Sequence, residues 1–157
     1  MADETMEPTR RPPPTPERRQ QRHESRTGST YKRFLKDLAA VGNMDMELAE
    51  CAAVSVLCAF ERRVYGEEAK DLESQLPLKL RELLSSCAVH EGKPSEKFGR
   101  QELLQMVADD LNEDPSEVEP IIRAVTLAVR DQITEGEAED FINMLPADLK
   151  ELWRLPA

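Results

Sequence analysis

The chain carries an internal repeat with an offset of 69 residues, and this repeat constrains the fold more than any other feature. Aligning residues 31–87 with residues 100–156 without a gap gives 15 identical pairs among 57. Two unrelated segments of ordinary composition would share about 4 identities. The repeat therefore predicts a duplicated structural unit, in which neighbouring copies pack together to bury one continuous core.

The identities are densest in a motif, Glu-Ala-x-Asp followed by Leu-Pro-x-x-Leu, that occurs once in each copy. A proline disfavours helical geometry in the residue before it and is tolerated at the start of a helix. Each Leu-Pro pair therefore predicts the joint between two short helices, and we interpret the motif as structural. Its residues are Glu68, Ala69, Asp71, Leu76, Pro77 and Leu80 in the first copy, and Glu137, Ala138, Asp140, Leu145, Pro146 and Leu149 in the second.

Apolar residues recur at helical spacing from Tyr31 onward, and no segment alternates as a strand would. The first stripe ends at Val41, and Gly42 is expected to end that helix in the left-handed conformation. Asp45 is expected to cap a long second helix. The buried stripes of the two long helices are predicted to be Ala49, Ala53, Val56, Phe60 and Val64 in the first copy, and Val118, Ile122, Val125, Val129 and Ile133 in the second.

Helix start signals mark the second copy as well. Asp114-Pro115-Ser116-Glu117 combines a capping residue with a proline at the first helical position, and Thr134 with Glu137 predicts a capping box. We therefore expect an all-α fold of about eight helices. The two copies of about four helices each would pack as one pseudo-twofold bundle, with Phe60 and Val129 at the seam.

Composition divides the chain into four parts: a Pro- and Arg-rich tail (1–28), repeat 1 (29–87), a linker (88–97) and repeat 2 (98–157). The tail has too few apolar side chains to offset the entropy of ordering, which predicts disorder. Two separate units joined by the linker are the alternative to one shared core.

The net charge of −10 is unevenly distributed. Six Arg and five acidic residues give the tail a charge of +1, so the remainder carries −11. An acidic body repels phosphate backbones and disfavours nucleic-acid binding, although the Arg-rich tail could act as a basic arm. No apolar run is long enough for a membrane span and no hydrophobic signal core is present, so we expect a cytoplasmic protein that does not contact a membrane. Cys51, Cys58 and Cys87 are expected to be small buried apolar residues.

No constellation of residues points to catalysis, a cofactor or a metal. The chain has no phosphate loop, no nucleophile elbow and no paired-Cys signature, and its two histidines are His23 and His90. The acids of the repeat motif could bind a cation or a basic partner, but acids near a helix N-terminus are expected for structural reasons. Glu82 and Glu151 are expected to be solvated. Trp153 is expected in the core, with a partner contact as the alternative.

The first copy of the repeat also resembles a known family. Gly66-Glu67-Glu68-Ala69-Lys70-Asp71-Leu72 followed by Gln75-Leu76-Pro77 is similar to the bacterial family catalogued as domain of unknown function 2267. The second copy matches less closely, since Met144 replaces the Gln. The resemblance covers about residues 31–154 and implies an all-helical, internally duplicated fold, without an established activity, cofactor or catalytic residue.

These observations predict a non-catalytic interaction or adaptor module whose partner is another protein. Two alternatives remain open at this point. One is nucleic-acid contact through the Arg-rich tail, and the other is binding of a small ligand between the repeats.

Overall fold

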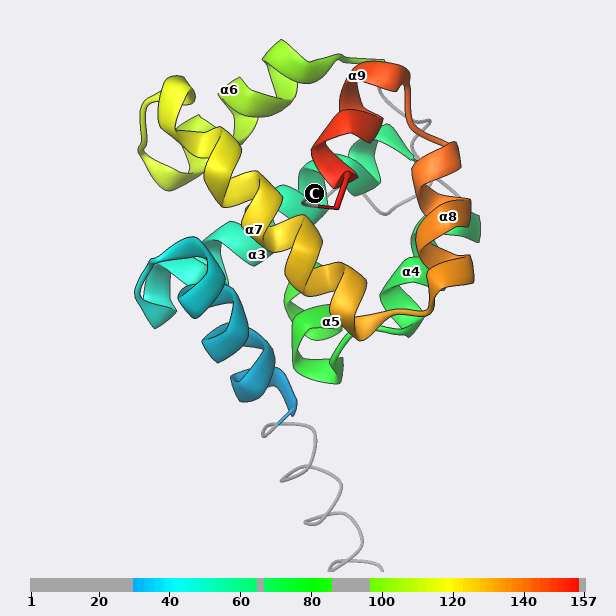
Figure 1. Ribbon diagram of the computed structural model, residues 1–157, viewed down its shortest axis with the longest axis horizontal. Coiled ribbons are helices and arrows are strands. Elements are labelled where there is room, and N and C mark those ends of the chain that lie inside the picture. Colours follow the sequence, from blue (N-terminus) through cyan, green and yellow to red (C-terminus); the bar gives the residue numbers. More distant parts are fainter. Residues whose placement is uncertain (1–29, 65–66, 86–96, 156–157) are drawn as a thin grey trace, which may run out of the picture.

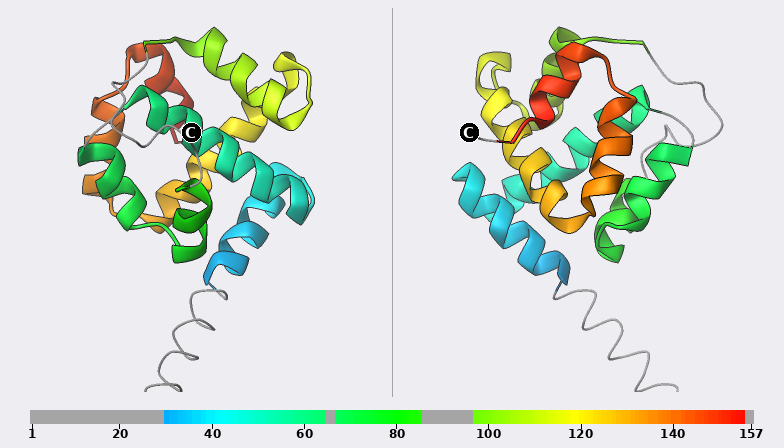
Figure 2. Two further views of the ribbon diagram at one scale, coloured as in Figure 1. Left: turned by 180° about the vertical axis from the view of Figure 1, so that it is seen from behind. Right: turned by 45° about the vertical axis from the view of Figure 1, so that its right-hand side comes forward.

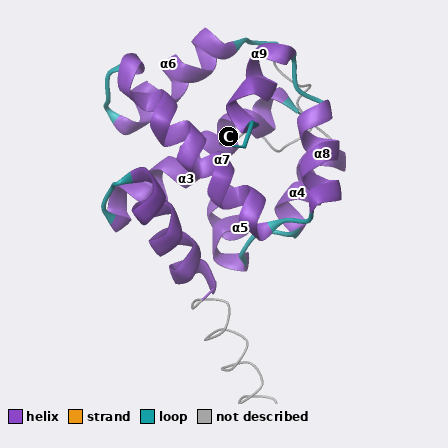
Figure 3. Ribbon diagram, in the orientation of Figure 1, coloured by secondary structure: helices purple, strands orange, loops and turns teal. Residues whose placement is uncertain are grey.

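A computed structural model describes residues 30–64, 67–85 and 97–155 (Figure 1). Within these ranges the chain consists of helices and connecting turns, without a strand, as Figure 3 shows. The predicted all-α class is therefore confirmed. The tail (1–28) and the linker (88–97), apart from Lys97, lie outside the described residues, so their predicted properties stay predictions.

Eight α-helices lie in the described ranges, in agreement with the expectation of about eight. In the first copy they are residues 30–42, α3 (Met46–Arg63), α4 (Glu67–Ser74) and α5 (Leu78–Leu84). In the second copy they are α6 (Arg100–Leu111), α7 (Val118–Gln132), α8 (Glu135–Asn143) and α9 (Ala147–Lys150). The short 3-10 helices η2 (Pro115–Glu117) and η3 (Glu151–Trp153) precede α7 and follow α9.

The helix starts follow from local sequence. Asp45 accepts a hydrogen bond from the N–H of Leu48 at 2.8 Å, and Asp114 accepts one from the N–H of Ser116 at 2.9 Å. Both predicted N-caps are confirmed, because these carboxylates satisfy amides that have no partner inside the helix. The bond to Ser116 is also the main reason that the pKa of Asp114 lies below its ordinary value.

The prediction that Gly42 adopts the left-handed conformation is wrong. The left-handed residue is Asn43 (φ 52°), and its counterpart Asn112 has the same conformation (φ 56°). Asparagine tolerates this region better than most residues. Gly42 lies in a crowded place instead, since a Cβ there would lie 2.2 Å from Cε at the flexible end of Met44 and 3.2 Å from Ala124 Cβ.

The core is centred where α7 crosses α3 (Figure 1). Phe60 and Val129, the two residues expected at the seam, are both fully buried. The ring of Phe60 contacts Trp153 edge to face at 5.3 Å between centroids, and Phe141 contacts the same indole at 5.5 Å. These aromatic pairs join helices of both copies in one hydrophobic cluster.

Other contacts also connect the copies. α6 packs against α3, and α4 lies beside α8, as the two views of Figure 2 show. At the end of α4, Gln75 Oε1 accepts a hydrogen bond from the N–H of Thr134 at 2.9 Å. Thr134 Oγ1 in turn accepts from the N–H of Glu137, which confirms the threonine half of the expected capping box. The other half differs from the expectation, because the N–H of Thr134 donates to Gln75.

The expectation for the cysteines is only partly confirmed. Cys51 is exposed and lines a surface hollow with Asp110 and Leu111. Cys58 is buried as expected, but it is disulfide-bonded rather than a free apolar thiol. Cys87 lies outside the described residues. No helix in the described ranges combines the length and the apolar character needed to cross a bilayer.

Candidate functional site

Most residues of the repeat motif lie where a structural role places them. Their apolar members are buried in both copies, at the contacts between short helices: Ala69, Leu76 and Leu80, with their counterparts Ala138, Leu145 and Leu149. Pro77 and Pro146 occupy the N-cap positions of α5 and α9, one residue before the first turn. The Leu-Pro pairs therefore mark helix joints, as predicted.

The acids of the motif do not form a metal site in the described part of the chain. Asp71 and Asp140 are exposed, Glu137 lies in the first turn of α8, and the side chain of Glu68 lies outside the described residues. Among the residues that the structure describes, no three His, Cys, Asp or Glu side chains gather as metal ligands would. The exposed aspartates fit solvated positions on α4 and α8.

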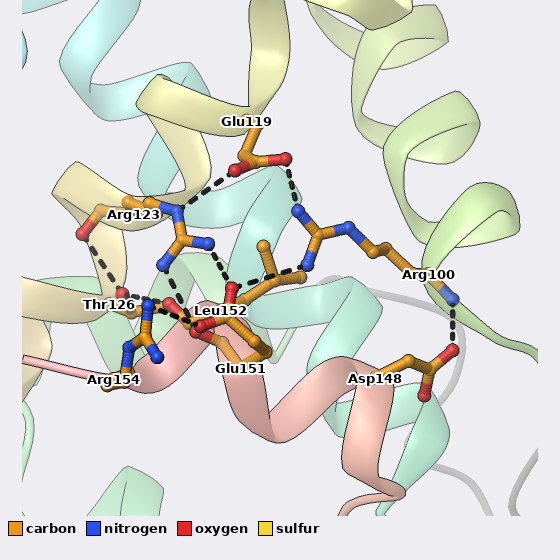
Figure 4. A network of polar contacts seen from close by, with 8 residues as sticks. All are labelled: Arg100, Glu119, Arg123, Thr126, Asp148, Glu151, Leu152 and Arg154. Atoms are coloured by element: carbon orange, nitrogen blue, oxygen red, sulfur yellow. Dashed lines mark hydrogen bonds and ion pairs between the residues drawn. The ribbon is translucent and has the colours of Figure 1, made fainter.

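A network of charged side chains connects α6, α7 and η3, as Figure 4 shows. Glu119 accepts hydrogen bonds from Arg100 and, at 3.1 Å, from Arg123. Glu151 pairs with Arg123 and also lies 3.7 Å from Arg100 and 3.1 Å from Arg154. The expectation that Glu151 is simply solvated is therefore wrong, because the turn into η3 brings its carboxylate over α7.

The network keeps its members charged. Partial desolvation raises the pKa of Glu119, but the hydrogen bonds from Arg100 and Arg123 outweigh it and hold this pKa below its ordinary value. The hydrogen bond from Arg123 likewise lowers the pKa of Glu151. The same bond raises the pKa of the Arg123 guanidinium. At neutral pH Arg100, Glu119, Arg123 and Glu151 therefore form a cluster of ion pairs, which is called the charged clamp below.

One face of α7 also binds the backbone of the C-terminal segment. Arg123, Thr126 and Arg130 donate to the carbonyls of Glu151, Leu152 and Trp153, at 3.1, 3.1 and 3.2 Å. The Glu151 carbonyl also accepts from the N–H of Arg154 at 3.3 Å, and side chains of α7 bind all three successive carbonyls at this helix end.

A groove lies beside this docked segment, between α7, the end of the 30–42 helix and residues 153–155. It has a volume of about 560 Å³ and is called the α7 groove below. Its apolar lining includes Val41, Ala124, Leu127 and Leu155, and its basic lining consists of Arg123, Arg130 and Arg154. A second hollow, of about 530 Å³, shares Arg130, Trp153, Arg154 and Leu155 with it.

One expectation is corrected here and another is confirmed. Val41 was expected on a buried stripe, but 54% of the residue is exposed, because the 30–42 helix ends where the groove begins. Trp153 lies against the groove but is only 1% exposed, since it packs between Phe60 and Phe141. The structure therefore confirms that Trp153 lies in the core, and its burial contradicts the alternative of an exposed partner contact.

The residues that line the groove were not recognised from the sequence, although a signal was present. With the offset of 69 residues, Arg123, Arg130 and Arg154 align with Val54, Glu61 and Ser85 of the first copy. Three basic residues therefore appear only in the second copy, and they are close together in space. The groove is therefore indicated by positions at which the two copies differ, and not by the positions at which they are identical.

A family model matches most of the chain. No curated protein matches the chain. The model of the family described as "Uncharacterized conserved protein (DUF2267)" matches residues 31–152, which include most of the described helices and the charged network up to Leu152. Since this match covers more than half of the 157 residues, the chain belongs to the DUF2267 family.

Proposed function

We propose that the protein is a non-catalytic interaction module that binds another protein through the α7 groove. The observation that carries this proposal is the composition of the groove. It combines exposed aliphatic side chains with three arginines, whereas residues 29–157 carry a charge of −11. A concave, partly apolar surface with a local charge opposite to that of the surrounding body is typical of a specific recognition site.

We also infer that the two copies are related by a pseudo-twofold axis. The helix bounds support this inference, since shifting α3 by 69 residues gives the combined bounds of η2 and α7, and α5 likewise gives α9 and η3. Equivalent contacts support it too. Tyr31 donates to Glu50 at 2.7 Å in the first copy, and Arg100 donates to Glu119 at the same place in the second.

The inferred symmetry allows the α7 groove to be compared with the equivalent positions of the other copy. Val41 and Ala124, which line it, have Asp110 and Ser55 as their counterparts. Ser55 donates to Asp110 at 2.7 Å. The hollow beside Asp110 is lined by three acidic residues together with Leu48, Cys51 and Leu111, and no basic residue lines it. The same fold thus accommodates opposite chemistry at equivalent places, so folding alone does not require a basic, apolar groove. This difference supports a binding role.

The chemistry of the groove supports a module without catalysis. Guanidinium groups stay protonated and act as hydrogen-bond donors rather than as bases. The described residues include no histidine, and the groove lining includes no carboxylate or thiol that could serve as a base or a nucleophile. Binding of a small ligand remains the second candidate, because about 560 Å³ lies within the usual range of ligand pockets.

A pair of matched variants tests the proposal. Val41→Gln with Leu155→Gln removes apolar surface from the groove, and Met46→Gln with Met144→Gln removes similarly exposed apolar surface elsewhere. Affinity purification from the native host, with quantitative mass spectrometry, should recover a partner with the wild type and the control pair but not with the groove pair. Equal recovery with both pairs, or no stoichiometric partner at all, would contradict the proposal.

A further inference from the structure

The arginines of the α7 groove differ in how many of their donors are already used. All three nitrogens of Arg123 already donate, to Glu119, Glu151 and a backbone carbonyl. Arg154 has one ion pair, with Glu151, and its side chain is 75% exposed. Arg130 donates to the Trp153 carbonyl and pairs with no carboxylate of the described residues. Two guanidinium groups, each with five N–H donors, therefore have donors to spare.

These two arginines stand between two adjoining hollows. Both Arg130 and Arg154 line the α7 groove and the second hollow, whose lining also includes Ile142, Ala147, Lys150 and Glu151. The apolar surface beside them comes from Val41 and Leu155, of which about half is exposed in each case. A compact ligand would occupy one hollow, whereas a chain segment can place successive side chains in both.

From this arrangement the geometry points to the partner's chemistry: the α7 groove binds an acidic, amphipathic segment of another protein, with carboxylates on Arg130 and Arg154 and apolar side chains against Val41 and Leu155. This inference rests on the function proposed above and adds the kind of segment that is bound. Arginine suits the role because its planar fork binds a carboxylate with two parallel hydrogen bonds.

The charge of the whole chain limits how acidic that segment can be. The body carries −11 and repels polyanions at long range. At physiological salt this repulsion is screened beyond about 8 Å, whereas hydrogen-bonded pairs in a groove are screened much less. A segment with a few carboxylates spaced among apolar residues is therefore favoured over a nucleic acid or an unbroken acidic run.

A peptide-display selection on the full-length protein tests the inference. The probe is a library of 16-residue peptides whose positions are drawn at random from Leu, Ile, Phe, Met, Asp, Glu, Lys and Arg. The selection should enrich peptides that combine apolar and acidic residues. Enrichment of basic peptides, or no enrichment over an unrelated protein, would overturn the inference.

The most enriched peptide is then measured by fluorescence polarisation against two double variants. Arg130→Gln with Arg154→Gln removes the carboxylate receptors, and Lys32→Gln with Lys36→Gln makes the same charge change at exposed positions of the 30–42 helix. Circular dichroism verifies that both variants are folded. We expect the first variant to weaken binding at least tenfold and the control to change it less than twofold. Equal effects of the two variants would overturn the inference.

The two proposals can fail separately. If the Val41→Gln, Leu155→Gln pair abolishes recovery of the native partner while no acidic peptide binds, the groove is the interaction site but its partner has other chemistry. If neither native partner nor peptide depends on the groove, both proposals are wrong.

Discussion

Glu61 is the buried ionisable side chain for which a pH-dependent stability can be predicted most sharply. It lies on α3 next to Phe60 and is 2% exposed. Burial, followed by the charge of Glu73 and a hydrogen bond with it, raises the pKa of Glu61 from 4.5 to about 10. The folded protein therefore keeps this carboxyl protonated at neutral pH, whereas the unfolded chain ionises it.

The sign and size of the effect follow from proton linkage. Because the folded state binds the extra proton, the free energy of unfolding is greatest below pH 4.5 and falls as the pH rises toward 10. Between pH 4.5 and pH 7 the loss amounts to about 3 kcal/mol, at 1.36 kcal/mol per pH unit. Glu61→Gln preserves the side-chain volume and removes this titration, so it should stabilise the protein by up to about 3 kcal/mol at pH 7 and leave it unchanged near pH 4.

Urea unfolding of the wild type and Glu61→Gln between pH 4 and pH 9 measures this difference. Glu82→Gln makes the same chemical change at an exposed position of α5 and is the matched control. The stability gain of Glu61→Gln should grow with pH and that of Glu82→Gln should not. A gain that is the same at every pH, or a loss at pH 7, would refute the assignment of Glu61 as a neutral buried carboxyl.

Three further predictions concern the core and the charged clamp. Phe60→Ala should destabilise the protein by about 3–5 kcal/mol in urea unfolding, because it leaves a cavity beside Trp153; an unchanged urea midpoint would contradict the packing of α3. Glu151→Gln should lower the melting temperature more at pH 7 than at pH 3. The pKa of Glu151 is depressed, so its stabilising contribution is present above the ordinary carboxyl pKa and is lost as the pH falls; equal losses at both pH values would refute this account. Finally, the chain should unfold in one calorimetric transition, since both copies contribute to one hydrophobic cluster, and two resolved transitions would favour separate units.

Features set by nearby residues were predictable from the sequence. The capping aspartates, Asp45 and Asp114, and the Leu-Pro joints act within a few residues of their own position, and the helical periodicity of the long helices reports one buried face. The sequence pattern predicts the left-handed residue at Gly42, whereas the structure has it one position later, at Asn43. A Cβ at Gly42 would crowd Met44 and, from the other copy of the repeat, Ala124, and this second neighbour is far away in the sequence.

The sequence by itself determined the all-helical class, the helix bounds to within a few residues and which faces of the long helices are buried, because these depend on local spacing and capping. Only the tertiary structure decided that Val41 is exposed, that Glu151 is ion-paired and that Arg123, Arg130 and Arg154 line one groove. Those properties depend on where α7, the 30–42 helix and η3 meet in space. The physical reason is that burial and charge pairing are set by neighbours distant in the chain, which no periodicity within one helix records.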